Sequence, residues 1–370
     1  MSNYSTRPRI LFVTPEVVFV PEGTGNRAYC IGACSGCFGD FLAEFIHDLL
    51  KLGVDVHVAQ PDYRKLFEML SRNEQANPSI KLPIDRVHFA EDRAFFYSKP
   101  INSNYEWENI KISLNFQREI INQIAPRIQP DLIHCHDWMT GLIPAAAKEY
   151  EMPCLFTVHN SDSAKSLLSD VEDRGIDAAA FWRYLFYDRF PGGYEDTRDS
   201  NPLDLLLSGI LAAHQVDTAS FQLLLNIAKD RSTIFYSCLR QVLAGKFNAG
   251  CACEMAGTPE PPVDATRDEK LYCKNGPIQQ HAGEQRAERA LRRSAPSFNH
   301  CAMAYHYVEL YERILQRPLV TPEKKKAHAI DKNGLTKASA SQAVSYPEAW
   351  STNPHVLYNE QVSNQAIAPV

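Results

Sequence analysis

The sequence predicts an α/β fold, a doubly wound parallel sheet with helices on both faces. Short runs of β-branched and aromatic residues, typical of buried strands, alternate through the first half of the chain with segments whose apolar residues recur at helical spacing. A turn that contains glycine, residues 33–40, joins the first predicted strand to the first predicted helix. Glycines in such a turn let backbone N–H groups approach a phosphate at the start of the helix. We therefore expect a ligand at the carboxyl ends of the strands.

The individual elements follow from the same two patterns. Strand-like runs cover 9–14, 54–59, 131–135, 153–158 and 215–220, and one or two more fall within 87–97. Helical spacing covers 41–50, 62–72, 106–128, 138–150, 164–172, 178–185, 202–213 and 298–316. Gly53 is placed to end the first helix in the left-handed conformation, and Pro126 is expected to end the long helix early.

Composition limits the class of protein. With 370 residues, 45% of them apolar, the chain can bury a sizeable core and is long enough for about two domains. A formal charge of −6 argues against nucleic acid or anionic membrane as the main partner. Pro15 and Glu16 interrupt the apolar run near the start, so neither a transmembrane segment nor a signal peptide is predicted. We therefore expect a cytoplasmic protein whose ten cysteines are reduced thiols.

Three groups of polar residues follow predicted strands directly. They are Thr14-Pro15-Glu16, His134-Cys135-His136-Asp137-Trp138 and Thr157-Val158-His159-Asn160. Each group has a structural alternative: Glu16 could cap a turn, Asp137 and the histidines before it could cap a helix, and His159 could be a core histidine with satisfied hydrogen bonds. All three groups stand at strand ends, where doubly wound folds bind ligands. The residues alone nevertheless favour the structural reading of the two histidine motifs, so the choice of a ligand site depends on a family resemblance.

The order and spacing of these motifs resemble those of the glycogen and starch synthases, retaining glucosyltransferases of the GT-B fold. The resemblance implies an N-terminal, Rossmann-like GT-B lobe that moves glucose from ADP-glucose or UDP-glucose to the non-reducing end of an α-1,4-glucan, with no cofactor and no metal. It implies that His159, whose family counterpart donates a hydrogen bond to the donor sugar, and Asp137 are catalytic. The substrate-binding residues that it implies are Glu16, Gly36, Gly39, Asp40, His136 and Asn160.

The glycine turn matches the family in part. Within the family's Lys-x-Gly-Gly-Leu-x-Asp loop, Gly36, Gly39 and Asp40 fit. Three positions differ: Cys34 replaces the lysine, Cys37 the second glycine and Phe38 the leucine. The loss of the lysine removes the cation that the family uses beside the sugar nucleotide.

The resemblance divides the chain into four parts. Residues 1–256 correspond to the N-terminal catalytic-type domain, and 298–318 to the family's final helix, which we expect to pack back on that domain. A connector at 257–297 stands where the family has a second lobe, with the Arg and Lys that clamp the donor diphosphate, and 319–370 is expected to be a mobile tail. We therefore predict an impaired glucosyltransferase. The alternative is a catalytically silent glucan-binding remnant, or a partner subunit of a chain that supplies the missing lobe.

Three cysteines offer a less favoured alternative, a metal protein. Cys30, Cys34 and Cys37 have the Cys-x3-Cys-x2-Cys spacing of radical S-adenosylmethionine enzymes, in which three thiolates hold a four-iron cluster. That motif usually has an aromatic residue just before its last cysteine, and this chain has Gly36 there. The flanking residues fit the synthase pattern better, so no metal is expected.

Overall fold

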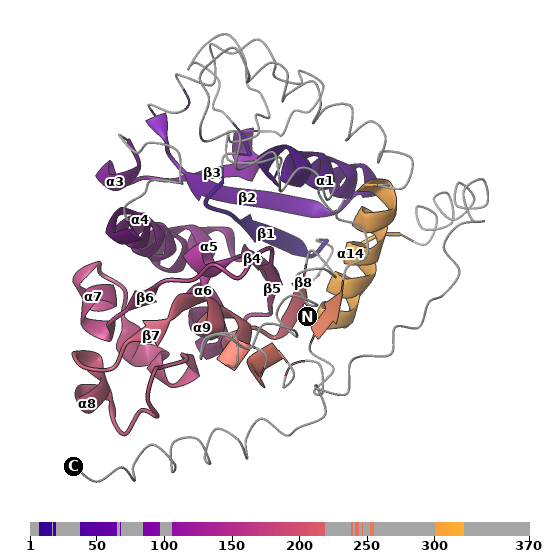
Figure 1. The fold of residues 1–370 in the computed structure, drawn as a ribbon. Helices are drawn as coiled ribbons and strands as arrows, with labels where there is room; N and C mark the ends of the chain where they lie inside the picture. Colours follow the sequence, from indigo (N-terminus) through magenta and orange to yellow (C-terminus); the bar gives the residue numbers. More distant parts are fainter. Residues whose placement is uncertain are drawn as a thin grey trace, which may run out of the picture.

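The computed structural model describes residues 7–16, 18–19, 38–64, 67, 84–96, 106–218, 238–239, 241–243, 246, 252–254 and 300–321. Within these residues, seven strands form one sheet in the order β3-β2-β1-β4-β5-β8-β9, and every neighbouring pair is parallel (Figure 1). The strands are β1 (Arg9–Val13), β2 (Asp55–Pro61), β3 (Val87–Ala90), β4 (Leu132–His136), β5 (Cys154–Val158), β8 (Gln215–Thr218) and β9 (Ala252–Glu254). The predicted doubly wound parallel sheet is confirmed.

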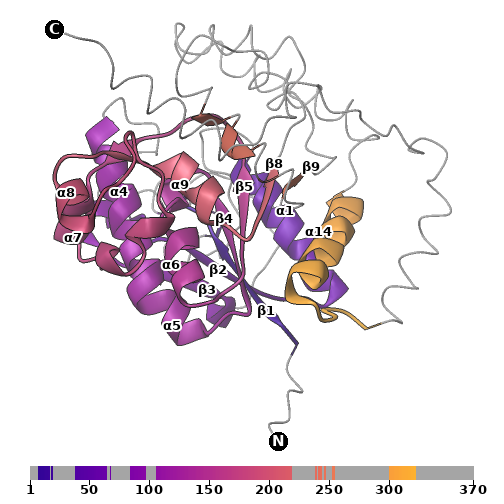
Figure 2. The same ribbon diagram turned by 90° about the horizontal axis from the view of Figure 1, so that it is seen from below.

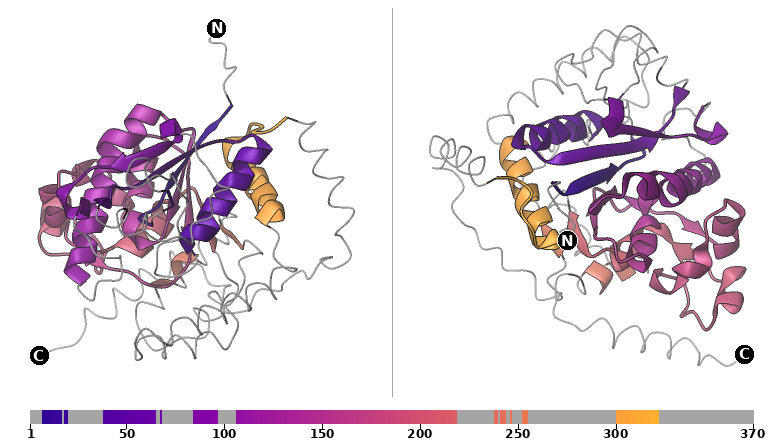
Figure 3. Two further views of the ribbon diagram at one scale, coloured as in Figure 1. Left: turned by 90° about the horizontal axis from the view of Figure 1, so that it is seen from above. Right: turned by 180° about the vertical axis from the view of Figure 1, so that it is seen from behind.

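Helices cover both faces of this sheet (Figures 2 and 3). One face carries α1 (Phe38–Leu52) and α14 (His300–Leu315), which pack side by side. The other face carries α4 (Glu106–Glu119), α5 (Ala125–Ile128), α6 (Ile143–Glu149) and α9 (Leu205–Ala212). Along the chain, the segment from β5 to β8 also contains two short helices and a small antiparallel pair of strands. The helices are α7 (Leu168–Asp173) and α8 (Tyr194–Arg198), and the strands are β6 (Lys165–Ser166) and β7 (Leu203–Asp204). The remaining elements are α3 (Arg93–Phe96), the π-helix η2 (Ile120–Ile124) and the 3₁₀ helices η1 (Ile84–Arg86), η3 (Trp138–Thr140), η4 (Ala178–Ala180) and η5 (Trp182–Tyr184).

The end of α1 is set by glycine, as predicted. Gly53 has a φ of 90°, a left-handed conformation that glycine adopts without a steric penalty. Its N–H donates to the carbonyl of Leu50 at 2.8 Å, and the N–H of Val54 donates to the carbonyl of Leu49 at 3.1 Å. These two bonds form a Schellman motif, which ends the helix and sends the chain into β2.

The prediction that Pro126 ends the long helix early was wrong. Helical structure continues from α4 through η2 into α5 and ends only after Ile128, where Gln129 has a φ of 51°. Pro126 is the second residue of α5, the helical segment that follows directly on the π-helical turn η2. A proline near the start of a new helical segment needs no N–H donor, so the change of winding at η2 accommodates it.

Other boundaries also differ from the prediction. The predicted helix at 138–150 begins with a 3₁₀ turn, and α6 starts only at Ile143, with Pro144 in the first turn where proline is favoured. The second half of 87–97 holds the helix α3, not a strand, and 178–185 forms two 3₁₀ turns. Strand β9 was not predicted.

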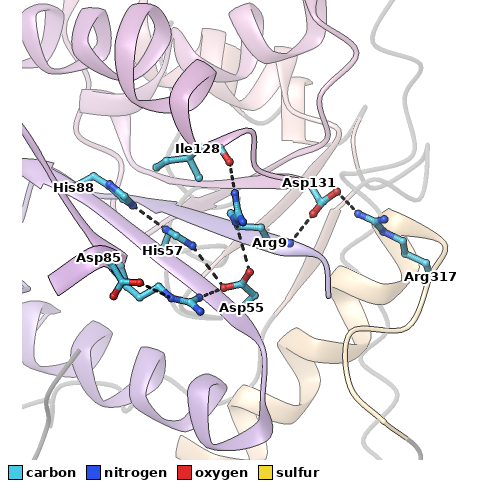
Figure 4. Close-up of polar contacts among 9 residues, drawn as sticks. Arg9, Asp55, His57, Asp85, His88, Ile128, Asp131 and Arg317 are labelled. Carbon is cyan, nitrogen blue, oxygen red and sulfur yellow. Dashed lines mark hydrogen bonds and ion pairs between the residues drawn. The ribbon is translucent and has the colours of Figure 1, made fainter. Parts of the chain in front are cut away.

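Charged residues at the amino ends of the strands tie the last described segment to the sheet (Figure 4). The backbone N–H of Arg9 donates to Asp131 Oδ2 at 2.7 Å, while Arg317, just after α14, pairs with Asp131 Oδ1. The Arg9 guanidinium lies 3.5 Å from Asp55 Oδ2 and also donates to the carbonyl of Ile128. The segment after α14 is therefore anchored beside the first strand. In the described part of the chain, no helix is both long enough and apolar enough to cross a membrane.

Candidate functional site

The site lies where the winding of the sheet reverses. The chain moves outward from β1 to β2 and β3, then returns to the middle and moves outward the other way from β4 to β5 and β8. The segments that follow β1 and β4 therefore diverge at the carboxyl ends of two neighbouring strands, which is where ligands bind in doubly wound folds. Glu16 follows β1, Asp137 follows β4 and His159 follows β5.

Asp137 has a strained backbone. Its φ of 57° and ψ of 179° lie in a region that residues with a side chain rarely occupy. The surrounding bonds hold it there: its N–H donates to the carbonyl of Thr157 at 3.1 Å, and its carbonyl accepts from the N–H of Thr140 at 3.1 Å and from the Thr140 hydroxyl at 3.0 Å. Strain of this kind costs about 1–3 kcal/mol and is typical of functional sites.

The Asp137 carboxyl group joins the ends of two strands. Asp137 Oδ1 accepts a hydrogen bond from the backbone N–H of His159 at 2.7 Å, and the backbone N–H of Asn160 also donates to this carboxyl. Asn160 Oδ1 accepts in turn from the N–H of Asp162 at 2.8 Å, which closes the turn after β5. The position of His159 therefore depends on Asp137.

His136 lies behind His159. Its Nδ1 is 3.1 Å from His159 Nε2, and the two rings are stacked with centroids 5.3 Å apart. His136 is buried, whereas His159 is partly exposed, so His159 is the histidine that a ligand can reach. Burial lowers the pKa of His159 to about 3 and that of His136 well below its usual range, so both rings are neutral at physiological pH.

Glu16 is held by a loop that the second strand supports. Its N–H donates to Thr14 Oγ1 at 3.1 Å. Gln60 in β2 pairs with the backbone of the same loop, because its Oε1 accepts from the N–H groups of Val18 and Phe19 at 3.0 and 2.9 Å. Gln60 was missed by the sequence analysis, although a glutamine at the end of an apolar strand was a usable signal.

Two carboxyl groups of the site, those of Glu16 and Asp137, have raised pKa values. Burial raises the pKa of Glu16 to about 7. Burial also raises the pKa of Asp137 to about 7, more than the two backbone N–H donors lower it, and the carboxylates of Asp162 and Glu16 add to the rise. Each carboxyl therefore carries a proton part of the time near neutral pH, when it can donate as well as accept a hydrogen bond.

The raised pKa of Asp137 predicts how stability depends on pH. The folded protein holds this proton more tightly than the unfolded chain, so protonation stabilises the fold below about pH 4, and this contribution is lost as the pH rises through about 7. Asp137→Asn removes the titration. Between about pH 5 and pH 8, wild type should lose roughly 1–2 kcal/mol of unfolding free energy relative to the variant, a figure reduced because the side chain is partly exposed. Urea unfolding of both proteins across this range checks it, and parallel pH curves would contradict it.

Several predicted residues cannot be placed by side chain. Gly36 and the cysteines Cys30, Cys34 and Cys37 lie outside the described residues, while Gly39 and Asp40 fall in the first turn of α1, where the backbone alone is described. In the described part of the chain, no group of three or more His, Cys, Asp or Glu side chains could hold a metal ion.

A second pair of histidines lies away from this site. His57 Nδ1 is 2.8 Å from His88 Nε2, on the neighbouring strands β2 and β3 (Figure 4). His57 joins this pair to the charged cluster at the amino ends of the strands, because its Nε2 lies 3.6 Å from Asp55 Oδ1. Burial lowers the pKa of both rings, that of His88 to about 4.

The fold and the site define a doubly wound α/β domain with a polar site at its switch point. The model of the starch synthase catalytic domain matches residues 9–234, more than half of the chain. This protein therefore belongs to the glycogen and starch synthase family, as its motifs indicated.

The relatives are distant and align in part. A glycogen synthase of Alkaliphilus metalliredigens is 27% identical over 151 residues, which cover 34% of this chain and 31% of that protein. A glycogen synthase of Cellvibrio japonicus is 29% identical over 152 residues, which cover 34% of this chain and 32% of that protein. The catalytic domain of starch synthase IV from Arabidopsis thaliana, solved with ADP and acarbose, is 15% identical with a TM-score of 0.44, over 68% of this chain and 51% of that one. The matched segment thus spans about a third of the length of these two curated relatives.

Proposed function

We propose that this chain binds glucosyl units at the carboxyl ends of β1, β4 and β5, as the acceptor-side lobe of a glucosyltransferase of the glycogen or starch synthase type. Its ligands would be an α-1,4-glucan and ADP-glucose or UDP-glucose, with His159 and Asp137 as the residues that contact the sugar. The observation that carries the proposal is the hydrogen bond from the His159 backbone to the Asp137 carboxyl at the switch point. The family supplies the class of substrate.

The chemistry of these side chains suits a sugar. His159 Nε2 already bonds to His136 Nδ1, so the ring would contact a sugar hydroxyl through His159 Nδ1, either as donor or as acceptor. Asp137 and Glu16, with pKa values of about 7, can each accept from a hydroxyl or donate to an ether oxygen. Because Asp137 is fixed by its strained backbone, and His159 by Asp137, the site would bind without first ordering its own residues.

We expect the chain by itself to transfer glucose very slowly or not at all. Cationic side chains help a nucleoside diphosphate to leave, and removing one of these side chains lowers the rate by a factor of about 10² or more. Among the described residues, the charged side chains that act on the pKa of Asp137 are those of Asp162 and Glu16, both acidic. Cys34 stands at the family's lysine position. A neutral glucan is not repelled by such a site. The acidic side chains around Asp137 therefore favour a second candidate function, a glucan-binding subunit without fast turnover.

Calorimetric titration of the purified chain with maltoheptaose, ADP-glucose and UDP-glucose would test the proposal, together with transfer of labelled glucose from each donor onto glycogen. We expect binding of maltoheptaose and little or no transfer. Transfer at a substantial rate, abolished by His159→Ala, would establish the enzyme and remove the silent-subunit candidate. Absence of binding to all three ligands would overturn the proposal.

A further inference from the structure

Two tyrosines of α14 reach into the buried polar interior between the helix and the sheet. Tyr311 is 0% exposed, and its hydroxyl lies 2.8 Å from His134 Nδ1. Tyr307 is 6% exposed, and its hydroxyl donates to Asp217 Oδ2 at 2.5 Å. The partners belong to β4 and β8, so α14 contacts the strands through hydrogen bonds as well as apolar packing.

The hydrogen bonds form one continuous chain, which fixes the tautomer of His134. The Thr157 hydroxyl donates to Asp217 Oδ1, so it can only accept from His134 Nε2, 2.7 Å away. His134 therefore carries its proton on Nε2, and its Nδ1 accepts from the Tyr311 hydroxyl. Burial lowers the pKa of His134 well below its usual range, which agrees with this neutral form.

This chain leads to the candidate site through packed rings. His134 and His136 lie two residues apart in β4, on the same face, with ring centroids 4.3 Å apart. The phenyl ring of Phe12 packs against both, at 4.7 and 6.0 Å. His136 then bonds to His159 at the strand ends. A rotation of the His134 ring would therefore press on His136 and displace the partner of His159.

We propose that Tyr311 and Tyr307 are positioning residues, which fix the row His134–His136–His159 and so allow α14 to set the affinity of the site for glucosyl ligands. The identity of the ligand depends on the proposed function, whereas the coupling between Tyr311 and His159 does not. Apolar side chains would pack α14 against the sheet without the cost of burying Asp217 and its donors, so packing alone does not account for this polar chain.

The test uses Tyr311→Phe in the full chain, with Tyr187→Phe as the matched control. Both changes delete one buried hydroxyl, but Tyr187 donates to the carbonyl of Trp182 at 2.8 Å, in a different cluster of the core. Histidines labelled with nitrogen-15 report the tautomer and ring environment of His134, His136 and His159, assigned by single substitutions. Calorimetry with maltoheptaose reports affinity.

We expect Tyr311→Phe to change the ring resonances of His134 and His159 and to weaken maltoheptaose binding by about 2- to 30-fold, while Tyr187→Phe changes neither. Tyr307→Phe should act in the same direction through Asp217 and Thr157. The proposal is overturned if the His159 resonances stay in place in a folded Tyr311→Phe protein, or if Tyr187→Phe moves them equally. Should wild type not bind the glucan, the proposed function fails, and the histidine resonances still decide the coupling.

Discussion

Replacing His159 with alanine is expected to raise the Kd for maltoheptaose about tenfold or more. The change removes a partly exposed imidazole at the carboxyl end of β5. Asp137 would still hold the backbone of residue 159, but no imidazole would remain there to contact the sugar. It also removes the ring that faces His136 Nδ1, so the buried histidine behind the site loses that contact. Calorimetric titration of the variant and of wild type would measure the loss directly.

A second histidine, His88 on strand β3, provides the control variant for this prediction. His88 is also a partly buried histidine that is hydrogen-bonded to another histidine, His57, with a pKa lowered by burial. It lies on the edge strand β3, which the three strands β2, β1 and β4 separate from β5. His88→Ala should leave glucan binding unchanged. Equal Kd values for His159→Ala and wild type would show that the strand ends do not contact the sugar.

The largest expected effect on stability belongs to Gly141→Ala, which should lower the unfolding free energy by about 3 kcal/mol. A Cβ atom at this position would lie 1.9 Å from the carbonyl oxygen of Leu205, which belongs to the start of α9. Backbone atoms cannot rotate away as a side chain can, so α9 would have to shift relative to the turn before α6. Gly209 approaches the same place, with its own added Cβ 3.1 Å from Gly141 Cα.

Gly192→Ala is the matched control for this substitution. Both changes restrict the unfolded chain to the same degree, which by itself stabilises by about 0.4–1 kcal/mol. A Cβ on Gly192 would meet nothing within 4 Å. Thermal and urea unfolding should therefore show a small gain or no change for Gly192→Ala and a large loss for Gly141→Ala. Similar stability for the two variants would mean that α9 does not pack tightly against Gly141.

The sheet and the strand-end residues could be predicted because both leave local patterns in the sequence. Strands β4 and β5 are buried at every position. Strand β5 is therefore an unbroken apolar or β-branched run, and in β4 the histidine His134 interrupts the apolar run before the final His136. Parallel strands bring their carboxyl ends to one edge of the sheet, so the fold class alone predicted that Asp137 and His159 lie near each other. Gly53 was predictable since a glycine after an amphipathic helix is a common signal for its end.

The contacts inside the site could not be predicted in the same way. The hydrogen bond between Asp137 and the His159 backbone depends on a rare backbone conformation and on the β4–β5 register that pairs His136 with Thr157. His134 belongs to the same motif as Asp137, yet it is buried beneath Tyr311, which is 177 residues away in sequence. No local periodicity carries such a contact, and the helical spacing of 298–316 predicts the helix without its partners.

A titration of the histidine-labelled chain with maltoheptaose, followed by nitrogen-15 NMR, tests most directly whether the ends of β1, β4 and β5 hold glucose. The account predicts that the ring resonances of His159, and to a smaller extent those of His136, move with the same Kd as the calorimetric signal, while those of His57 and His88 stay in place. Saturable binding that leaves His159 unperturbed, or that moves His57 and His88 instead, would contradict it.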